Sequence, residues 1–177
     1  MALSGGPTQD EIMAISLQKL RLKPGDRVVD IGCGTGKVSL AAAHLAGEVY
    51  AIDRRAEAIA EARAAAEREG AYNVTFLQGE AVDLLESLGG LDAAFVGGSR
   101  DLPAVLEMLA DQVKGAIVVN AVLVRTLATA IESMRDLGIF QEAVLVQVSR
   151  SHEVAGEVMF KPINPVYIVV GGRDPCS

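Results

Sequence analysis

The sequence is poor in aromatic residues and in basic charge. It has no tryptophan, three tyrosines and four phenylalanines, and its formal net charge at pH 7 is -7. Proteins that bind single-stranded nucleic acid stack aromatic side chains on the bases, and most nucleic-acid binders present a basic face to the phosphates. Both properties are scarce here, so the composition argues against a nucleic-acid partner.

Cysteine, histidine and long apolar runs are scarce as well. The two cysteines, Cys33 and Cys176, and the two histidines, His44 and His152, have no spacing typical of a disulfide framework or a metal site. No apolar run approaches the roughly 20 residues that cross a bilayer, and the first residues lack the pattern of a signal peptide. We therefore predict a cytoplasmic, soluble protein with no metal and no membrane contact.

What is present is a repeating pattern of strands and helices. Half of the 177 residues are hydrophobic, which suits a single domain over residues 1–177. We expect the first helix to begin with a capping box, in which Thr8 caps the helix and Glu11 lies three positions on. Apolar, β-branched runs that alternate with helical segments predict strands at 27–31, 48–53, 73–79, 91–98 and 115–120.

The pattern changes toward the C-terminus. A long strand is expected at 140–150 and a last strand at 166–172, with no helix between them. Strands joined without a helix pair most simply as antiparallel neighbours. The sequence therefore predicts an α/β, Rossmann-like fold, with a mostly parallel seven-stranded sheet and an antiparallel last strand.

The loop after the first strand reads DIGCGTGK and begins a helix, a context in which glycine loops bind ligands. A phosphate-binding P-loop needs Ser or Thr after Gly-Lys, where this chain has Val38. The dinucleotide pattern GxGxxG fits its first two glycines, but Lys37 stands at the third. The pattern DxGxGxG of S-adenosylmethionine (SAM)-dependent methyltransferases fits throughout Asp30–Gly36. We expect the Asp30 carboxylate to orient the loop or the cationic amino group of the ligand.

Other positions fit the same ligand. SAM has no phosphate, so the backbone of Gly32, Cys33, Gly34, Thr35 and Gly36 must approach its methionine and ribose closely, which glycine permits. Asp53 ends the second strand about 20 residues beyond the loop, where an acid accepts hydrogen bonds from both ribose hydroxyls. Glu80 and Ala81 follow the third strand, where such enzymes contact adenine. Glu80 fits equally well as a helix N-cap.

Longer segments resemble one methyltransferase family. They are GGPTQDEIMAISLQKLRLKPGDRVVDIGCGTG at 5–36, FVGGS at 95–99, VVNAV at 118–122 and NPVYIVV at 164–170. Together they resemble the CbiT family, the decarboxylating precorrin-6B carbon-15 methyltransferases of cobalamin biosynthesis. The family also occurs as the C-terminal half of bifunctional CobL proteins. The resemblance extends from about Gly5 to Val170, nearly the whole chain.

The resemblance implies a reaction and an assembly. A methyl group would pass from SAM to carbon 15 of precorrin-6B or its cobalt form, leaving S-adenosylhomocysteine, and the ring-C acetate would lose carbon dioxide. Thr8 would lie beside the methionine end, and Gly97 would face the methionine and the transferred methyl. The resemblance also implies a homotetramer that is fused to, or works with, a carbon-5 methyltransferase domain. Because the conjugated macrocycle can accept the electrons of decarboxylation, we identify no indispensable catalytic acid or base.

A tetrapyrrole with many carboxylates requires local cations on an acidic protein. Sites on a doubly wound sheet lie beyond the carboxyl ends of the strands, where Arg100 follows the fourth strand and Arg125 the fifth. The planar fork of arginine binds both oxygens of a carboxylate. Ser99 and Asn120 lie in the same rim and fit equally well as caps of the following helices. Three further cations lie near the last strands: Arg150, His152 and Lys161.

Three other functions remain open. The first is a SAM-dependent methyltransferase for another small molecule, RNA or protein. Enzymes that methylate exocyclic amines often have Asn/Asp-Pro-Pro-aromatic after the fourth strand, where this chain reads GGSR. The second is a SAM-binding module without turnover, which the intact loop and Asp53 disfavour. The third is an NAD-dependent oxidoreductase, which the displaced third glycine disfavours.

Overall fold

The computed structural model describes residues 8–173 and gives them an α/β fold. Seven strands form the main sheet: β1 (Arg27–Ile31), β2 (Glu48–Asp53), β3 (Val74–Gln78), β4 (Ala93–Val96), β5 (Ala116–Ala121), β6 (Phe140–Val146) and β9 (Val166–Gly172). Six helices accompany them: α1 (Asp10–Leu20), α2 (Lys37–Ala43), α3 (Ala56–Glu69), α4 (Ala81–Leu88), α5 (Leu102–Gln112) and α6 (Val124–Asp136).

The strand order is β3-β2-β1-β4-β5-β9-β6. The pairs β1–β2, β1–β4, β2–β3 and β4–β5 are parallel, whereas β9 is antiparallel to both β5 and β6. The prediction of a mostly parallel seven-stranded sheet with an antiparallel last strand is confirmed. The bounds of β1 and β2 are those expected from their apolar runs, because buried parallel strands are continuously hydrophobic.

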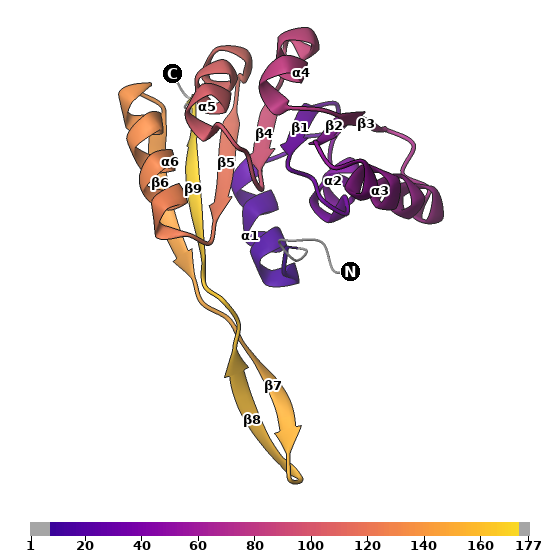
Figure 1. The fold of residues 1–177 in the computed structure, drawn as a ribbon, viewed down its shortest axis with the longest axis vertical. Helices are drawn as coiled ribbons and strands as arrows, with labels where there is room; N and C mark the ends of the chain where they lie inside the picture. The colour runs from indigo at the N-terminus through magenta and orange to yellow at the C-terminus, as the bar shows by residue number, and fades with distance from the viewer. Residues whose placement is uncertain (1–7, 174–177) are drawn as a thin grey trace.

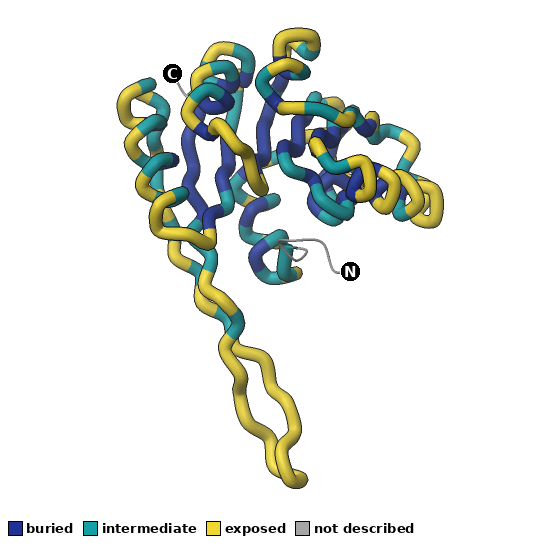
Figure 2. The backbone as a smooth tube through the Cα atoms, in the orientation of Figure 1, coloured by how far each residue is buried: buried dark blue, intermediate teal, exposed yellow. Residues whose placement is uncertain are grey.

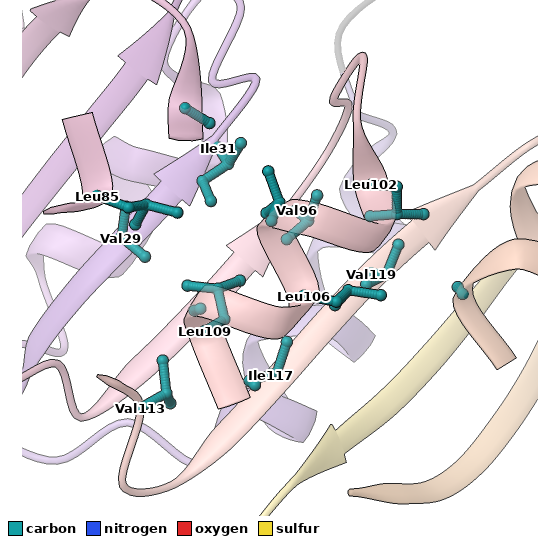
Figure 3. Packing of buried hydrophobic residues seen from close by; sticks show 14 of the residues in the cluster. Val29, Ile31, Leu85, Val96, Leu102, Leu106, Leu109, Val113, Ile117 and Val119 are labelled. Atoms are coloured by element: carbon teal, nitrogen blue, oxygen red, sulfur yellow. The ribbon is translucent and has the colours of Figure 1, made fainter. Parts of the chain in front are cut away.

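Helices cover both faces of the sheet (Figure 1). On one face α4, α5 and α6 bury side chains such as Leu85, Leu106 and Met134 against the strands. Figure 3 shows Leu102, Leu106 and Leu109 of α5 lying over Val96 and neighbouring strand residues. On the other face α1, α2 and α3 bury Ile12, Val38 and Ala62. The sheet itself is the most deeply buried layer (Figure 2).

The C-terminal region differs from the expected single strand at 140–150. Strand β6 ends at Val146, and a separate antiparallel hairpin follows, made of β7 (Ser149–Val154) and β8 (Glu157–Pro162). The hairpin projects from the body of the protein (Figure 1), and all its strand residues are exposed (Figure 2). The hairpin forms a two-stranded sheet separate from the main one.

The predicted capping box at Thr8 and Glu11 is wrong. Helix α1 begins after Gln9, whose side chain makes no capping bond. Lys37 instead donates to the carbonyl oxygen of Thr8 at 2.9 Å and pairs with Asp10 at 2.6 Å. Glu11 accepts two hydrogen bonds from Arg150. Charged partners from distant elements therefore replace the local capping interaction and tie the start of α1 to the glycine loop.

Candidate active site

The candidate site lies where the strand order reverses. Strands β2 and β4 flank β1 on opposite sides, so the loops that follow β1 and β4 turn toward opposite halves of the sheet. Ligands of such sheets bind in the crevice outside the carboxyl ends of the strands at this point. The loops after β1, β2, β3, β4 and β5 all meet at this edge because their strands run parallel.

The glycine loop fits closely between its neighbours. Gly32 has a φ of +74°, and a Cβ built on it would lie 2.4 Å from the carbonyl oxygen of Gly98, in the loop after β4. Gly36 has a φ of +81°, and its Cβ would lie 2.9 Å from the Cβ of Ala62 in α3. At Gly34 the nearest group is the guanidinium of Arg55, 3.8 Å from the built Cβ. The loop is therefore packed at both ends, and its middle faces Arg55.

Asp53, at the end of β2, is bound to that loop. Its Oδ2 accepts from the backbone N–H of Gly34 at 3.0 Å and from Nη2 of Arg55 at 2.9 Å. Its Oδ1 accepts from the backbone N–H and from Nε of Arg55, both at 3.0 Å. The side chain is only 4% exposed. Burial opposes ionisation, but these hydrogen bonds outweigh it, so the pKa of Asp53 lies below its ordinary value.

Asp30, the first acid of the loop pattern, has a different environment. Its Oδ2 accepts from the hydroxyl of Ser39 in α2. Its Oδ1 is buried and has no hydrogen-bond partner within the part of the chain that the structure describes. Burial raises the pKa of Asp30 to about 7, against the hydrogen bonds from Ser39. The carboxyl group thus ties the loop to α2 and keeps one acceptor oxygen unused.

The predicted adenine turn adjoins Asp53. The N–H of Gly79 donates to the carbonyl oxygen of Asp53 at 3.2 Å, which brings the end of β3 beside the end of β2. Glu80 precedes α4 at the N-cap position without a side-chain capping bond, and Ala81 is buried. The Glu80 carboxylate lies 3.5 Å from the guanidinium of Arg100. This ion pair links the adenine turn to the loop after β4.

Of the residues predicted to lie at the substrate site, some are exposed to solvent and one is hydrogen-bonded within the protein. Residues 97–100, which contain Gly97, Ser99 and Arg100, are exposed, and so is Arg125 in the first turn of α6. Asn120 is occupied, because its amide nitrogen donates to Ser16 of α1 at 3.0 Å. Neither Ser99 nor Asn120 occupies an N-cap position, contrary to their alternative interpretation. Asp101 caps α5, and α6 begins after Leu123.

Apolar side chains lie beside Arg125 at the same edge. Val122, Leu123 and Val124 are consecutive and are 56%, 68% and 67% exposed. Three consecutive exposed apolar residues require an explanation on a protein with a well-filled core, because exposed apolar patches mark binding surfaces. The rim after β5 therefore combines an apolar surface with a cation.

Several remaining positions limit the chemistry. Cys33 is buried, and its burial raises the pKa of the thiol, so it is no activated nucleophile. Arg150 pairs with Glu11, whereas His152 and Lys161 lie exposed on the hairpin. Within residues 8–173 no group of three His, Cys, Asp or Glu side chains is placed to hold a metal ion. None of the described helices has the length and apolarity to cross a membrane.

Sequence patterns did not identify three partners of the site. Ser39 bonds to Asp30, Arg55 binds Asp53, and Lys37 bonds to the carbonyl oxygen of Thr8. The position of Ser39, in the first turn of α2 on its inward face, is a usable signal for the first. The position of Arg55, two residues after an acid that ends a strand, is a usable signal for the second.

The strand order, the antiparallel β9 and the glycine loop at the switch point define the fold of Rossmann-like SAM-dependent methyltransferases. A model of the precorrin methyltransferase domain matches residues 3–171. A probable cobalt-precorrin-6B C(15)-methyltransferase (decarboxylating) from Methanosarcina acetivorans is 51% identical over 178 residues, covering 98% of this chain and 97% of the relative.

Solved structures agree. One described as precorrin-8W decarboxylase from Methanobacterium thermoautotrophicum is 35% identical, with a TM-score of 0.91 over 95% of this chain and 92% of that chain. One described as precorrin-6Y C5,15-methyltransferase from Geobacter metallireducens is 32% identical, with a TM-score of 0.90 over 97% and 91%. The chain belongs to the precorrin methyltransferase family, and it is a methyltransferase.

The packing of Gly32 against Gly98 yields a first prediction. Gly32→Ala should lower the free energy of unfolding by roughly 3 kcal/mol, because it combines backbone strain with a clash against backbone. Gly138→Ala is the matched control, since Gly138 has a φ of +70° but, apart from its chain neighbours, no atom of residues 8–173 lies within 4 Å of a Cβ built on it. It should cost only about 1 kcal/mol from strain. Urea denaturation of both variants measures the difference, and equal losses would contradict the close approach.

The burial of Asp30 yields a second prediction, on pH dependence. The pKa of about 7 in the folded protein lies above the ordinary 3.8, so the folded state binds this proton more tightly. Between these values stability falls as pH rises. The free energy of unfolding of the wild type, minus that of Asp30→Asn, should therefore decrease by about 2–4 kcal/mol from about pH 4 to about pH 7. Asp111→Asn, at an exposed position of α5, should leave the wild-type profile unchanged. A constant difference between wild type and Asp30→Asn would contradict the assignment.

Proposed function

We propose that this enzyme transfers a methyl group from SAM to carbon 15 of precorrin-6B or its cobalt form and decarboxylates the ring-C acetate. The observation that carries the proposal is the 51% identity, over nearly the whole of both chains, to a relative named for that reaction. The intact glycine loop and Asp53 support SAM as the donor and S-adenosylhomocysteine as the product. A methyltransferase for another substrate is the second candidate, favoured by no particular contact.

The residues at the switch point fit SAM. The middle of the glycine loop, at Gly34, presents backbone with no side chain. A Cβ built on Gly34 would lie 3.8 Å from Nη2 of Arg55, the end of a flexible side chain. Asp53 lies at hydrogen-bonding distance from that loop and suits a ribose diol. The buried Oδ1 of Asp30, which has no hydrogen-bond partner among residues 8–173, is an acceptor that suits a cationic amino group, directly or through water. Thr8 lies near the same loop through its contact with Lys37.

The rim after β4 and β5 suits a large anionic substrate. The apolar residues Val122, Leu123 and Val124 fit the flat face of a macrocycle, and Arg100 and Arg125 fit its carboxylates. Arg100 is paired with Glu80 at 3.5 Å, an exposed contact that a substrate carboxylate readily replaces. Ser99 adds a hydroxyl on the same rim. Asn120 contributes by fixing α1 through Ser16.

The chemistry places modest demands on the protein. SAM would supply a methyl group on a sulfonium: the attacking carbon of the substrate would bond to that methyl carbon in line with the breaking S–CH3 bond, and S-adenosylhomocysteine would leave with the electron pair. Decarboxylation breaks a carbon–carbon bond, and the electron pair passes into the conjugated macrocycle. The residues of this chain therefore bind, align and exclude water, which is the main source of rate in such a transfer. We infer that no side chain is indispensable as a general acid or base.

Turnover tests the proposal directly. Incubation of the protein with SAM and cobalt-precorrin-6B, or the metal-free form, should yield a product that has gained one methyl group and lost carbon dioxide, as measured by mass spectrometry. Arg125→Gln should raise KM for the tetrapyrrole about tenfold or less, the loss of one charged hydrogen bond. It should leave the Kd of SAM unchanged. Arg68→Gln, exposed on α3 at the other end of the sheet, is its control.

Two results would contradict the proposal. The absence of any product with either tetrapyrrole, in a protein that binds SAM, would favour the second candidate. An equal KM for Arg125→Gln and Arg68→Gln would remove the rim after β5 from the substrate site.

The assembly forms part of the proposal. We infer a homotetramer in which the hairpin β7–β8 contacts other copies of the chain. An isolated two-stranded hairpin is marginally stable in water, and this one exposes Val154, Val158, Met159 and Phe160. Val158 and Phe160 are two positions apart and share one face. We also infer one domain over residues 1–177, a cytoplasmic location, and a relationship with a carbon-5 methyltransferase domain, fused or separate.

Hairpin variants test the assembly. Val158→Asp combined with Phe160→Asp should reduce the molar mass measured by light scattering from that of a tetramer to that of a smaller species. The charges oppose burial of this face, since a buried unpaired charge is costly. Glu157→Gln, on the opposite face of the same hairpin, should keep the tetramer. A monomeric wild type, or an unchanged mass for the Asp variant, would contradict the inference.

A further inference from the structure

We propose that Arg55 competes with the cofactor for Asp53. In the free protein its guanidinium holds the two acceptor positions that the ribose hydroxyls take, so that cofactor binding is an exchange rather than a simple addition. This inference rests on the proposed function only in requiring a ligand with a ribose at Asp53.

The hydrogen-bonding capacity of Asp53 is the first step. An ionised carboxylate offers about four lone-pair positions. Each oxygen of Asp53 accepts two hydrogen bonds, one from a backbone N–H and one from the guanidinium of Arg55. No position is left for a ribose hydroxyl. The backbone donors of Gly34 and Arg55 are fixed by the glycine loop and the turn after β2. The guanidinium donors are the ones that side-chain rotation can release.

Burial is the second step. The Asp53 side chain is 4% exposed, whereas that of Arg55 is 25% exposed. A diol therefore cannot reach the carboxylate while the guanidinium stays in place. The guanidinium also lies 3.8 Å from a Cβ built on Gly34, at the middle of the loop expected to lie against the cofactor. One group thus covers both the carboxylate and the open part of the loop.

Energetics give the consequence of this arrangement. A buried carboxylate left without partners is strongly disfavoured, so Arg55 stabilises the free protein. Cofactor binding replaces two hydrogen bonds from a cation with two from neutral hydroxyls, which still have an ionised acceptor but lack the attraction between opposite charges. Only those molecules in which the guanidinium has moved away can bind the cofactor. Because they are a small fraction of the total, the apparent affinity for the cofactor is lowered in proportion to that fraction. Arg55 therefore sets the affinity for donor and product, and it favours release of the product after turnover.

Calorimetry with S-adenosylhomocysteine tests the competition. This probe lacks the positive charge of the sulfonium. A gain in its affinity on removal of Arg55 therefore cannot come from relief of repulsion between Arg55 and a sulfonium. Arg55→Ala should bind the probe about tenfold more tightly than the wild type, equivalent to about 1.4 kcal/mol. The neighbouring Arg54→Ala, at an exposed position, should bind it with wild-type affinity.

The Asp53→Ala background separates competition from a general effect of charge. With the carboxylate absent there is nothing to compete for, so Arg55→Ala should change affinity less than twofold in that background. An equal gain in both backgrounds would overturn the proposal. So would an unchanged or weaker affinity of Arg55→Ala with Asp53 present. If neither the wild type nor any variant binds the probe, the proposed function fails. If the wild type binds it and Arg55→Ala does not bind it more tightly, only the competition fails.

An NMR titration of the wild type needs no variant to fold. The Nε–H signal of Arg55, identified by its loss in Arg55→Ala, should show slow exchange with solvent in the free protein, because it is bonded to Asp53. Addition of S-adenosylhomocysteine should shift this signal and accelerate its exchange. A signal that stays in place and protected at saturation would show that the pair persists in the complex, and the proposal would fall.

Discussion

The hydrogen bond from the Gly34 N–H to the Asp53 carboxylate is the contact on which the site depends. It joins the loop after β1 to the end of β2 at 3.0 Å, and the Asp53 side chain that accepts it is 4% exposed. The same carboxylate bonds to the backbone of the turn after β2, so two loops share one anion. A site assembled from separate loops needs such a common partner, because loops alone have little reason to keep a fixed relative position.

Two buried acids, Asp30 and Asp53, show how the environment sets charge. Asp53 accepts four hydrogen bonds, two from a cation and two from backbone N–H groups, and its pKa falls. Asp30 accepts from Ser39, its other oxygen has no partner in the described part of the chain, and burial raises its pKa to about 7. Burial raises the pKa of both groups and prevails at Asp30, whereas at Asp53 the hydrogen bonds from Arg55 and Gly34 outweigh it. The two acids therefore have different roles. Asp53 stays ionised and can accept hydrogen bonds from hydroxyl groups, whereas Asp30 ionises more readily when a cationic ligand binds beside it.

The sequence predicts the frame of this site better than its details. The apolar runs locate β1 and β2 to the residue, and the sequence correctly places the glycine loop between β1 and α2, because both depend on neighbours along the chain. The pairing of Arg55 with Asp53 and of Ser39 with Asp30 depends on rotamers and on the approach of separate elements. The capping box at Thr8 failed for the same reason, since Lys37 and Arg150 come from elsewhere in the fold. The sequence predicts one strand over 140–150, across the break between β6 and β7, because the alternation of side chains continues past the end of β6.

The central claim is that Asp53 fixes the loop and receives the ribose when Arg55 leaves it. A crystal structure of the protein with S-adenosylhomocysteine tests this most directly. The account predicts that the Gly34 N–H remains bonded to Asp53, that both ribose hydroxyls lie within hydrogen-bonding distance of the carboxylate, and that the guanidinium of Arg55 has moved away. A complex in which the guanidinium keeps both contacts with Asp53 and the ribose lies elsewhere would contradict it.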